Sequence, residues 1–122
     1  MNAMPFEMLT NSVAHVSSDN NRPILYNIQS ALDLIANAWF EGDFTRLVIL
    51  KQDVCEEFFN PQTGIADNMK RRFSNYGFQV AIVGDFSTYA NKHVLDYIRE
   101  SNKGKALRFT DDFDSAIDLL SS

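Results

Sequence analysis

The amino-acid sequence predicts an α/β fold with a single mixed, mostly parallel sheet and about four helices, in one domain over residues 1–122. Two observations support this prediction. The apolar runs "RLVIL" and "QVAIV" have the length and composition of strands that are covered on both faces. Segments with helical periodicity precede and follow these runs, and strands that alternate with helices usually pair in parallel through right-handed crossovers.

The chain is expected to open with short strands. "FEML" and "VAHVS" are typical of two extended segments around the polar turn "TNS". In the second segment, Val13 and His15 would lie on one side, and Ala14 and Val16 on the other. No second His lies at metal-ligand spacing from His15, which favours a structural role. "ILYNI", after Pro23, is expected to add another brief strand.

The first helix is expected to begin at Ser30 as the N-cap, with Asp33 placed favourably in its first turn. Gly42 is expected to end it. Its buried stripe follows the spacing i, i+3, i+4 and i+7, which selects Leu32, Ile35, Ala36 and Trp39.

Three more helices are expected in the second half of the chain. The mixed connection at residues 51–64 leads to a helix that ends at Gly77, with a stripe of Ile65, Ala66, Met69, Phe73 and Tyr76. Asn91 would cap the next helix, which carries Val94, Leu95 and Ile98 and ends at "ESNKG" with Gly104 in the left-handed conformation. "KALRF" would form the last strand. Asp112 would then open a final helix with Phe113, Ala116, Ile117 and Leu120 facing inward.

Composition narrows the classes of function. The net charge of −5 argues against nucleic acid as the main partner, because binding phosphates requires a basic face. No apolar run approaches the roughly 20 residues that cross a membrane. The N-terminal "MNAMPFEM" lacks the features of a secretion signal, and the lone Cys55 with two His offers neither a disulfide nor a metal framework. We therefore expect a cytoplasmic protein without a metal or another cofactor.

Three polar turns are candidate sites, because ligands and partners of open α/β sheets meet the carboxyl ends of strands and the helix N-termini beyond them. In the first, Thr63 and Gly64 precede the second helix. Thr63 could be a simple N-cap or a hydroxyl that is phosphorylated where the helix dipole favours negative charge.

The other two turns follow the predicted strand "QVAIV" and the third helix. Gly84, Asp85 and Ser87 lie beyond "QVAIV", but they lack the glycines and the Lys of a phosphate loop. Asp85 is more consistent with a turn cap than with a Mg²⁺ ligand. Glu100, Ser101 and Asn102 form the third candidate site, for which solvated surface is the equal alternative. No nucleophile elbow is present, and the acids after Cys55 would raise its pKa, so catalysis is unsupported but open.

The chain resembles a family of small prokaryotic proteins known as the domain of unknown function 4180 family. The resemblance rests on "QSALDLIANAWFEG", "EFFNPQTGIA", "FSNYGFQVAIVGDFSTYANK" and "ESNKG…F". The chain has Asn60-Pro61 where we expect Asp-Leu, and Asn91 where we expect Ser. The order of predicted elements is similar to that of STAS domains, which include anti-sigma-factor antagonists. In those domains a phosphorylated Ser or Thr precedes a Gly at the turn that Thr63-Gly64 would occupy, although the usual Asp-Ser-Ser-Gly turn is absent.

Two functions are consistent with these features. The first is a non-enzymatic module that binds a protein partner, with Thr63 and the Gly84-Asp85 turn on one rim and phosphorylation as its control; a homodimer is one form of such binding. The alternative is a protein or enzyme that binds a small molecule such as a nucleotide, phosphate or lipid, through Asp85, Ser87, Glu100 and Asn102.

Overall fold

The computed structural model describes residues 5–18 and 22–121. Its strands are β1 (Phe6–Met8), β2 (Val13–Val16), β3 (Arg46–Leu50), β4 (Gln79–Val83) and β5 (Leu107–Thr110), and its helices are α1 (Ile28–Gly42), α2 (Ile65–Asn75), α3 (Lys92–Ser101) and α4 (Phe113–Ser121). The strands form one sheet in the order β1-β2-β3-β4-β5, in which β1 is antiparallel to β2 and the other pairs are parallel. The predicted mixed, mostly parallel sheet with four helices is therefore confirmed. No helix of the described segments is long and apolar enough to cross a membrane.

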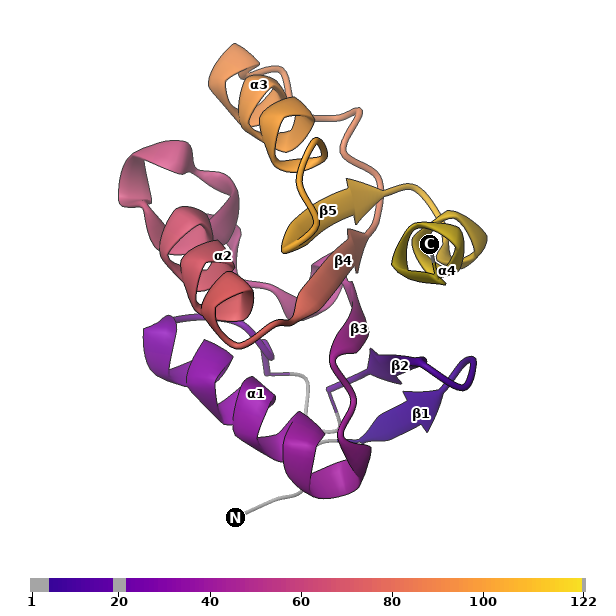
Figure 1. The fold of residues 1–122 in the computed structure, drawn as a ribbon. Helices are drawn as coiled ribbons and strands as arrows, with labels where there is room; N and C mark the ends of the chain where they lie inside the picture. Colours follow the sequence, from indigo (N-terminus) through magenta and orange to yellow (C-terminus); the bar gives the residue numbers. More distant parts are fainter. Residues whose placement is uncertain (1–4, 19–21, 122) are drawn as a thin grey trace.

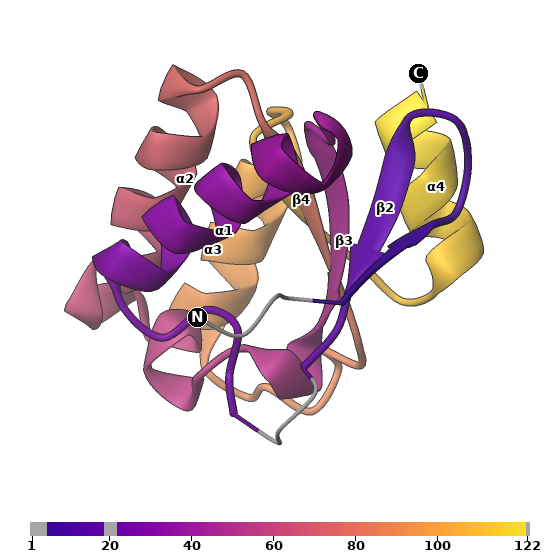
Figure 2. The ribbon, with the colours of Figure 1, turned by 90° about the horizontal axis from the view of Figure 1, so that it is seen from below.

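The helices divide unequally between the two faces of the sheet (Figures 1 and 2). α1, α2 and α3 cover one face and enclose the larger core, while α4 covers the other face alone. The larger core takes Ala14 and Val16 from β2, and the smaller core takes Val13 from the same strand. The predicted alternation of β2 is therefore confirmed for these residues.

The central strands β3 and β4 are buried on both faces. Leu47 and Ile49 of β3 face the larger core, and Val48 between them faces α4. These three side chains have no exposed surface. Leu47 pairs with Val80 and Ile49 with Ile82, so the neighbouring strand repeats the same alternation. Burial on both faces explains why "RLVIL" and "QVAIV" are continuous apolar runs.

The start of α1 differs from the prediction. Asn27, not Ser30, is the N-cap: its side chain accepts a hydrogen bond of 2.8 Å from the Ser30 N–H. The Ser30 hydroxyl in turn accepts the N–H of Asn27, which completes a capping box. "ILYNI" forms no strand because its last residue already belongs to this helix, and only Leu25 makes an isolated bridge, to Val54.

The buried stripe of α1 is also rotated relative to the prediction. Ala31, Leu34, Ile35 and Ala38 are its buried apolar residues, whereas Ala36 and Trp39 are exposed and Leu32 is half-buried. The i+7 spacing predicted that Trp39 lies in the buried stripe, but its ring lies on the flank of the helix, where it packs against Tyr76 and Phe78. The helix ends through Asp43, which takes the left-handed conformation expected of Gly42.

The ends of the later helices agree in part with the sequence. Asn91 caps α3, and the Asp112 side chain accepts a hydrogen bond from the Ser115 N–H at the start of α4. Gly77 has a positive φ of 75° after α2. Gly104 does not have the predicted positive φ, because α3 ends in a right-handed residue, Asn102. Leu95 and Tyr76, placed in buried stripes, are 37% and 46% exposed.

Two side chains at the end of α3 close the outer edge of β5. The β4 main chain pairs with Ala106 and Thr110, so the main-chain groups of Leu107 and Phe109 point away from the sheet. The Ser101 hydroxyl donates to the Leu107 carbonyl (2.5 Å). The Asn102 carboxamide accepts from the Phe109 N–H (2.8 Å) and donates to its carbonyl (3.2 Å), as a further strand would. These bonds blunt an edge that could otherwise pair with another chain.

Replacing Asn102 should therefore cost more than replacing an ordinary surface Asn. In Asn102→Ala, two main-chain groups of Phe109 lose their partners, and we expect unfolding by urea to show a loss of about 1–3 kcal/mol. Asn68→Ala, on the exposed face of α2, is the control and should change stability by no more than about 0.5 kcal/mol. Equal stability of the two variants would contradict the edge-closing role.

Candidate functional site

The carboxyl ends of β3 and β4 place two residues side by side. Leu50 pairs with Val83 at the last position of the two strands, so Lys51 and Gly84 follow as neighbours. The chain then turns into the three short 3-10 segments Lys51–Asp53, Glu56–Phe59 and Pro61–Thr63 on one side, and into the "DFSTY" loop on the other. We call this end of the sheet, from Lys51 to Gly64 and from Gly84 to Tyr89, the carboxyl rim.

Gly84 permits a close approach of the Lys51 side chain. A Cβ atom on residue 84 would lie 2.5 Å from the Lys51 Cβ and 3.0 Å from its Cδ, which is too close for carbon atoms. Gly84 has no positive φ, so conformational freedom is not the reason for glycine at this position. From the sequence, Gly84 is expected to permit a tight turn. In the structure, the missing side chain of Gly84 instead leaves room for the side chain of Lys51.

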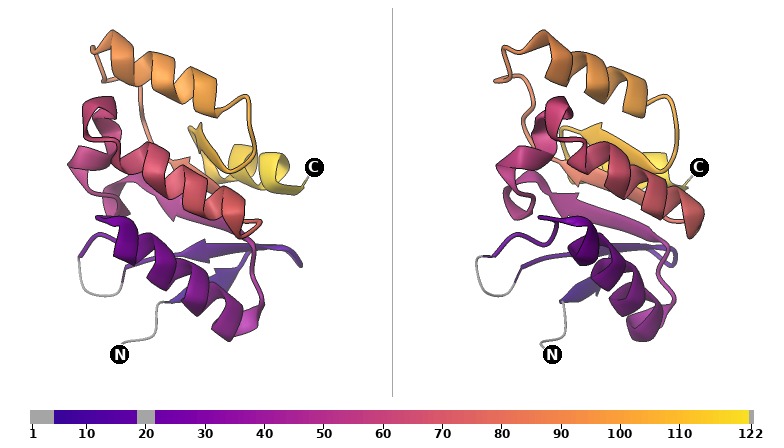
Figure 3. Two further views of the ribbon diagram at one scale, coloured as in Figure 1. Left: turned by 60° about the vertical axis from the view of Figure 1, so that its left-hand side comes forward. Right: turned by 90° about the vertical axis from the view of Figure 1, so that its left-hand side faces the viewer.

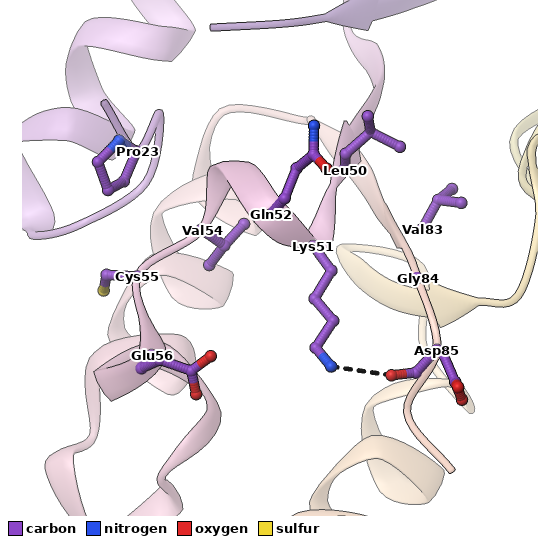
Figure 4. Close-up of a pocket in the computed structure, with 10 residues that line it drawn as sticks. All are labelled: Pro23, Leu50, Lys51, Gln52, Val54, Cys55, Glu56, Val83, Gly84 and Asp85. Atoms are coloured by element: carbon purple, nitrogen blue, oxygen red, sulfur yellow. Dashed lines mark hydrogen bonds between the residues drawn. The ribbon is translucent and has the colours of Figure 1, made fainter. Parts of the chain in front are cut away.

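Lys51 is held from two directions. Its Nζ donates a hydrogen bond of 2.8 Å to the carbonyl oxygen of Asp85 (Figure 4). The same Nζ lies 4.5 Å from the ring centroid of Tyr89 and 5.5 Å from that of Phe86. Each such cation–π contact stabilises by about 0.5–1 kcal/mol at exposed sites. Lys51 therefore joins the end of β3 to the loop that follows β4.

Asp85 caps its own turn, as the sequence suggests. Its Oδ1 accepts hydrogen bonds from the Ser87 N–H (2.9 Å) and from the Ser87 hydroxyl (2.5 Å). These two bonds hold the pKa of the Asp85 carboxyl below its ordinary value, and the carboxyl therefore stays ionised at neutral pH. Asp85 and Ser87 are both exposed at the surface of the carboxyl rim.

A cluster of aromatic rings connects the two halves of the carboxyl rim. Phe59, from the second 3-10 segment, lies 5.9 Å from Phe86 and stacks on Tyr89 at 5.7 Å. Phe86 in turn packs edge-to-face on Phe109 of β5 at 5.4 Å. The ring of Phe59 therefore contacts the same two rings that lie beneath the Lys51 ammonium.

Thr63 lies at the end of the third 3-10 segment, one residue before the N-cap of α2. Gly64, with φ of 71°, occupies the N-cap position that was one of the two predicted roles of Thr63. The Thr63 hydroxyl lies 2.8 Å from each of the carbonyl oxygens of Glu57 and Asn60 and accepts from the Ile65 N–H at 3.3 Å. The residue is exposed. Its hydroxyl thus fastens the segment that carries Phe59 to the start of α2.

An open pocket of about 670 Å³ lies between the two halves of the carboxyl rim (Figure 4). Its walls combine apolar side chains with one ammonium and two carboxylates. The lining residues are Pro23, Leu50, Lys51, Gln52, Val54, Cys55, Glu56, Val83, Gly84 and Asp85. Burial raises the pKa of the Cys55 thiol, and the charge of Glu57 adds to the rise, in the direction that the sequence indicates. The Cys55 thiol is therefore a poor nucleophile at neutral pH.

The third candidate turn lies away from this pocket. α3 follows β4 and runs back along the sheet, so Glu100, Ser101 and Asn102 lie at the opposite rim, next to the start of β5 (Figure 3). Ser101 and Asn102 close the β5 edge, and Glu100 pairs with Lys103 at 3.0 Å on the surface. The expectation that these residues share a site with Asp85 and Ser87 is wrong, because the helix between them spans the sheet.

Comparison with known protein families identifies the chain at the level of the family. The family described as "Domain of unknown function (DUF4180)" matches residues 10–120. The chain belongs to the DUF4180 family. No curated protein and no solved structure matches it. The similarity of its element order to STAS domains remains a prediction.

Lys51, at the carboxyl rim, was not among the candidate site residues predicted from the sequence. Lys51 lies outside any phosphate-loop motif, in which the Lys precedes Ser or Thr in a glycine-rich loop. A usable signal was present. "RLVIL" and "QVAIV" have equal length, and if they pair in register, the residues after them, Lys51 and Gly84, must be neighbours. Within the described residues, no group of three or more His, Cys, Asp or Glu side chains could hold a metal ion.

The close approach of Lys51 to Gly84 predicts how a methyl group at position 84 changes the stability of this DUF4180 protein. Gly84→Ala should destabilise the protein by about 1–3 kcal/mol, because the new Cβ overlaps the Lys51 side chain. Gly104→Ala is the matched control. Its Cβ would have its nearest contact at 3.7 Å, so this variant should stay within about 0.5 kcal/mol of the parent in urea unfolding. Equal losses in both variants would count against the close approach.

Proposed function

We propose that this chain is a non-enzymatic regulatory module that binds a protein partner at the carboxyl rim. The observation that carries the proposal is the shape and lining of the pocket between Lys51 and Asp85. It is open rather than enclosed, and its wall mixes apolar side chains with charges of both signs. Protein surfaces that bind other proteins combine an apolar centre with a polar rim in this way, whereas small-molecule sites bury most of their ligand.

Phosphorylation of Thr63 would give this surface a switch. The hydroxyl hydrogen is shared between the carbonyls of Glu57 and Asn60, and a phosphate would replace it with negative charge beside two carbonyl oxygens. Both bonds would be lost, and the segment that carries Phe59 would be released from the start of α2. Phe59 packs on Phe86 and Tyr89 beneath Lys51, so the change would reach the pocket through contacts within one cluster.

The binding surface can be tested by crosslinking in native cells. A photo-reactive residue at Gln52, which is exposed and lines the pocket, should capture a specific protein, and Glu56→Arg should abolish the capture by reversing a charge in the wall. The matched controls lie on α4, across the sheet. A photo-reactive residue at Asp118 should not capture that protein, and Asp118→Arg should leave capture from position 52 unchanged. If no protein is captured, or if Glu56→Arg and Asp118→Arg behave alike, the proposal fails.

A small-molecule ligand is the second candidate, because the pocket volume falls within the range of about 300–1,000 Å³ known for ligand sites. A thermal-shift screen with nucleotides, phosphosugars and acyl carriers separates the two ideas. A ligand at about 100 times its Kd would add about 2.7 kcal/mol of stability. A shift that Glu56→Arg removes, without any protein crosslink from position 52, would favour the ligand over the protein partner.

The proposed switch at Thr63 predicts a modification and its effect. Mass spectrometry of the protein from native cells should find phosphate on Thr63, and the phosphorylated form should give less crosslinked product from position 52. Thr63→Ser should keep both the phosphate and the response, since it keeps the hydroxyl, whereas Thr63→Ala should lose both. A Thr63→Ala variant that folds and is regulated like the parent would exclude the switch.

A further inference from the structure

An exposed aromatic patch lies at the C-terminal ends of α1 and α2. Phe40 exposes 87% of its surface, Trp39 exposes 43% and Tyr76 exposes 46%. Trp39 packs edge-to-face on Tyr76 at 5.4 Å and thereby joins the two helices. Isolated exposed apolar side chains are ordinary, but a group of large ones marks a surface that contacts another molecule. We call Trp39, Phe40 and Tyr76 the aromatic patch.

The aromatic patch is separate from the pocket of the carboxyl rim. α1 and α2 lie side by side and point in the same direction (Figure 3). α2 leads into β4 and α1 leads into β3, so the C-terminal ends of both helices lie where these strands begin. The carboxyl rim lies where the same strands end. A partner on the aromatic patch would therefore leave the Lys51 pocket open.

The two helices that carry the aromatic patch have opposite charge. The charged side chains of α1 are acidic, Asp33 and Glu41, and its C-cap is Asp43. α2 carries Lys70, Arg71 and Arg72 against a single acid, Asp67, which pairs with Arg71 at 3.5 Å. Glu41 and Arg72 are both exposed. The charged side chains of α1 are thus acidic, and those of α2 are mainly basic.

We propose that a second copy of this chain covers the aromatic patch in a symmetric dimer. The two-fold axis runs between α1 and α2, along their length. A half-turn about this axis places α1 of one copy on α2 of the other, so that each acidic helix meets a basic one and the two aromatic patches meet each other. An axis across the helices would place α1 on α1 and α2 on α2, where like charges repel.

The charge pattern favours a second copy over a different protein. A partner with a surface of one sign would be attracted by one helix and repelled by the other. The surface of this chain matches both helices at once, because it contains both signs in the required order. The net charge of −5 on each copy opposes association at long range, but screening reduces that term beyond about 8–10 Å. The local pairs and the apolar contact decide the outcome.

The dimer can be tested first by removing the apolar contact. Analytical ultracentrifugation of the full chain should show a monomer–dimer equilibrium, and Phe40→Ser should raise the dimer Kd by about tenfold or more, because exposed aromatic anchors dominate such interfaces. Leu95→Ser, which changes an exposed apolar residue on α3 outside the patch, is the control and should leave the Kd unchanged. A monomeric parent chain, or a dimer that Phe40→Ser does not weaken, would overturn the proposal.

The direction of the axis has a sharper test. Glu41→Lys alone and Arg72→Glu alone should each weaken self-association, since each places like charges across both halves of the interface. Mixing these two variants should restore a dimer, because every cross-contact in the mixed pair joins opposite charges. Circular dichroism checks that both variants fold. If the mixture stays monomeric although the parent dimerises, or if the monomer instead captures another protein through Phe40, the symmetric arrangement is wrong.

Discussion

Burial of β3 and β4 on both faces is the constraint on which the rest of the molecule depends. Three helices on one side and α4 on the other exclude water from the middle of these strands, so their side chains must be apolar throughout. Polar side chains are therefore concentrated at the two rims of the sheet and on the outer surfaces of the helices, although Arg108 of β5 is buried and bonds to Gln79 and to the Leu119 carbonyl. The pocket, the Thr63 segment and the aromatic patch all lie in these regions.

The parts of the carboxyl rim are connected by mutual contacts. The absence of a side chain on Gly84 lets Lys51 cross the end of β4, and Lys51 then binds the Asp85 carbonyl and covers the rings of Phe86 and Tyr89. Phe59 extends the same cluster towards Thr63. Because these contacts form one connected cluster, the loss of any one of them would affect the others.

Apart from "ILYNI", the strands and the order of elements were predicted correctly, because apolar runs and alternation report burial directly. Local errors arose where competing residues were close together. Asn27 and Ser30 are both good caps, and the structure uses Asn27 as the N-cap and Ser30, the predicted N-cap, as the third helical residue of the capping box. Gly42 was expected to end the first helix, but the helix includes Gly42 and its left-handed C-cap is Asp43. The site was harder to predict, since the role of Lys51 depends on the alignment of β3 with β4, and the roles of Ser101 and Asn102 depend on how the end of α3 packs along β5.

The closure of β5 by its own preceding helix restricts how the chain can change in length. Asn102 bonds to Phe109 from seven positions away and Ser101 bonds to Leu107 from six, so residues 103–106 form a bridge of fixed span between two anchored points. An exposed side chain of this bridge, such as that of Lys105, can vary in identity. An inserted or deleted residue would instead displace Ser101 and Asn102 relative to Leu107 and Phe109, so that these hydrogen bonds could not all form. Relatives that keep the Ser-Asn pair should therefore also keep the number of residues that separates it from the strand.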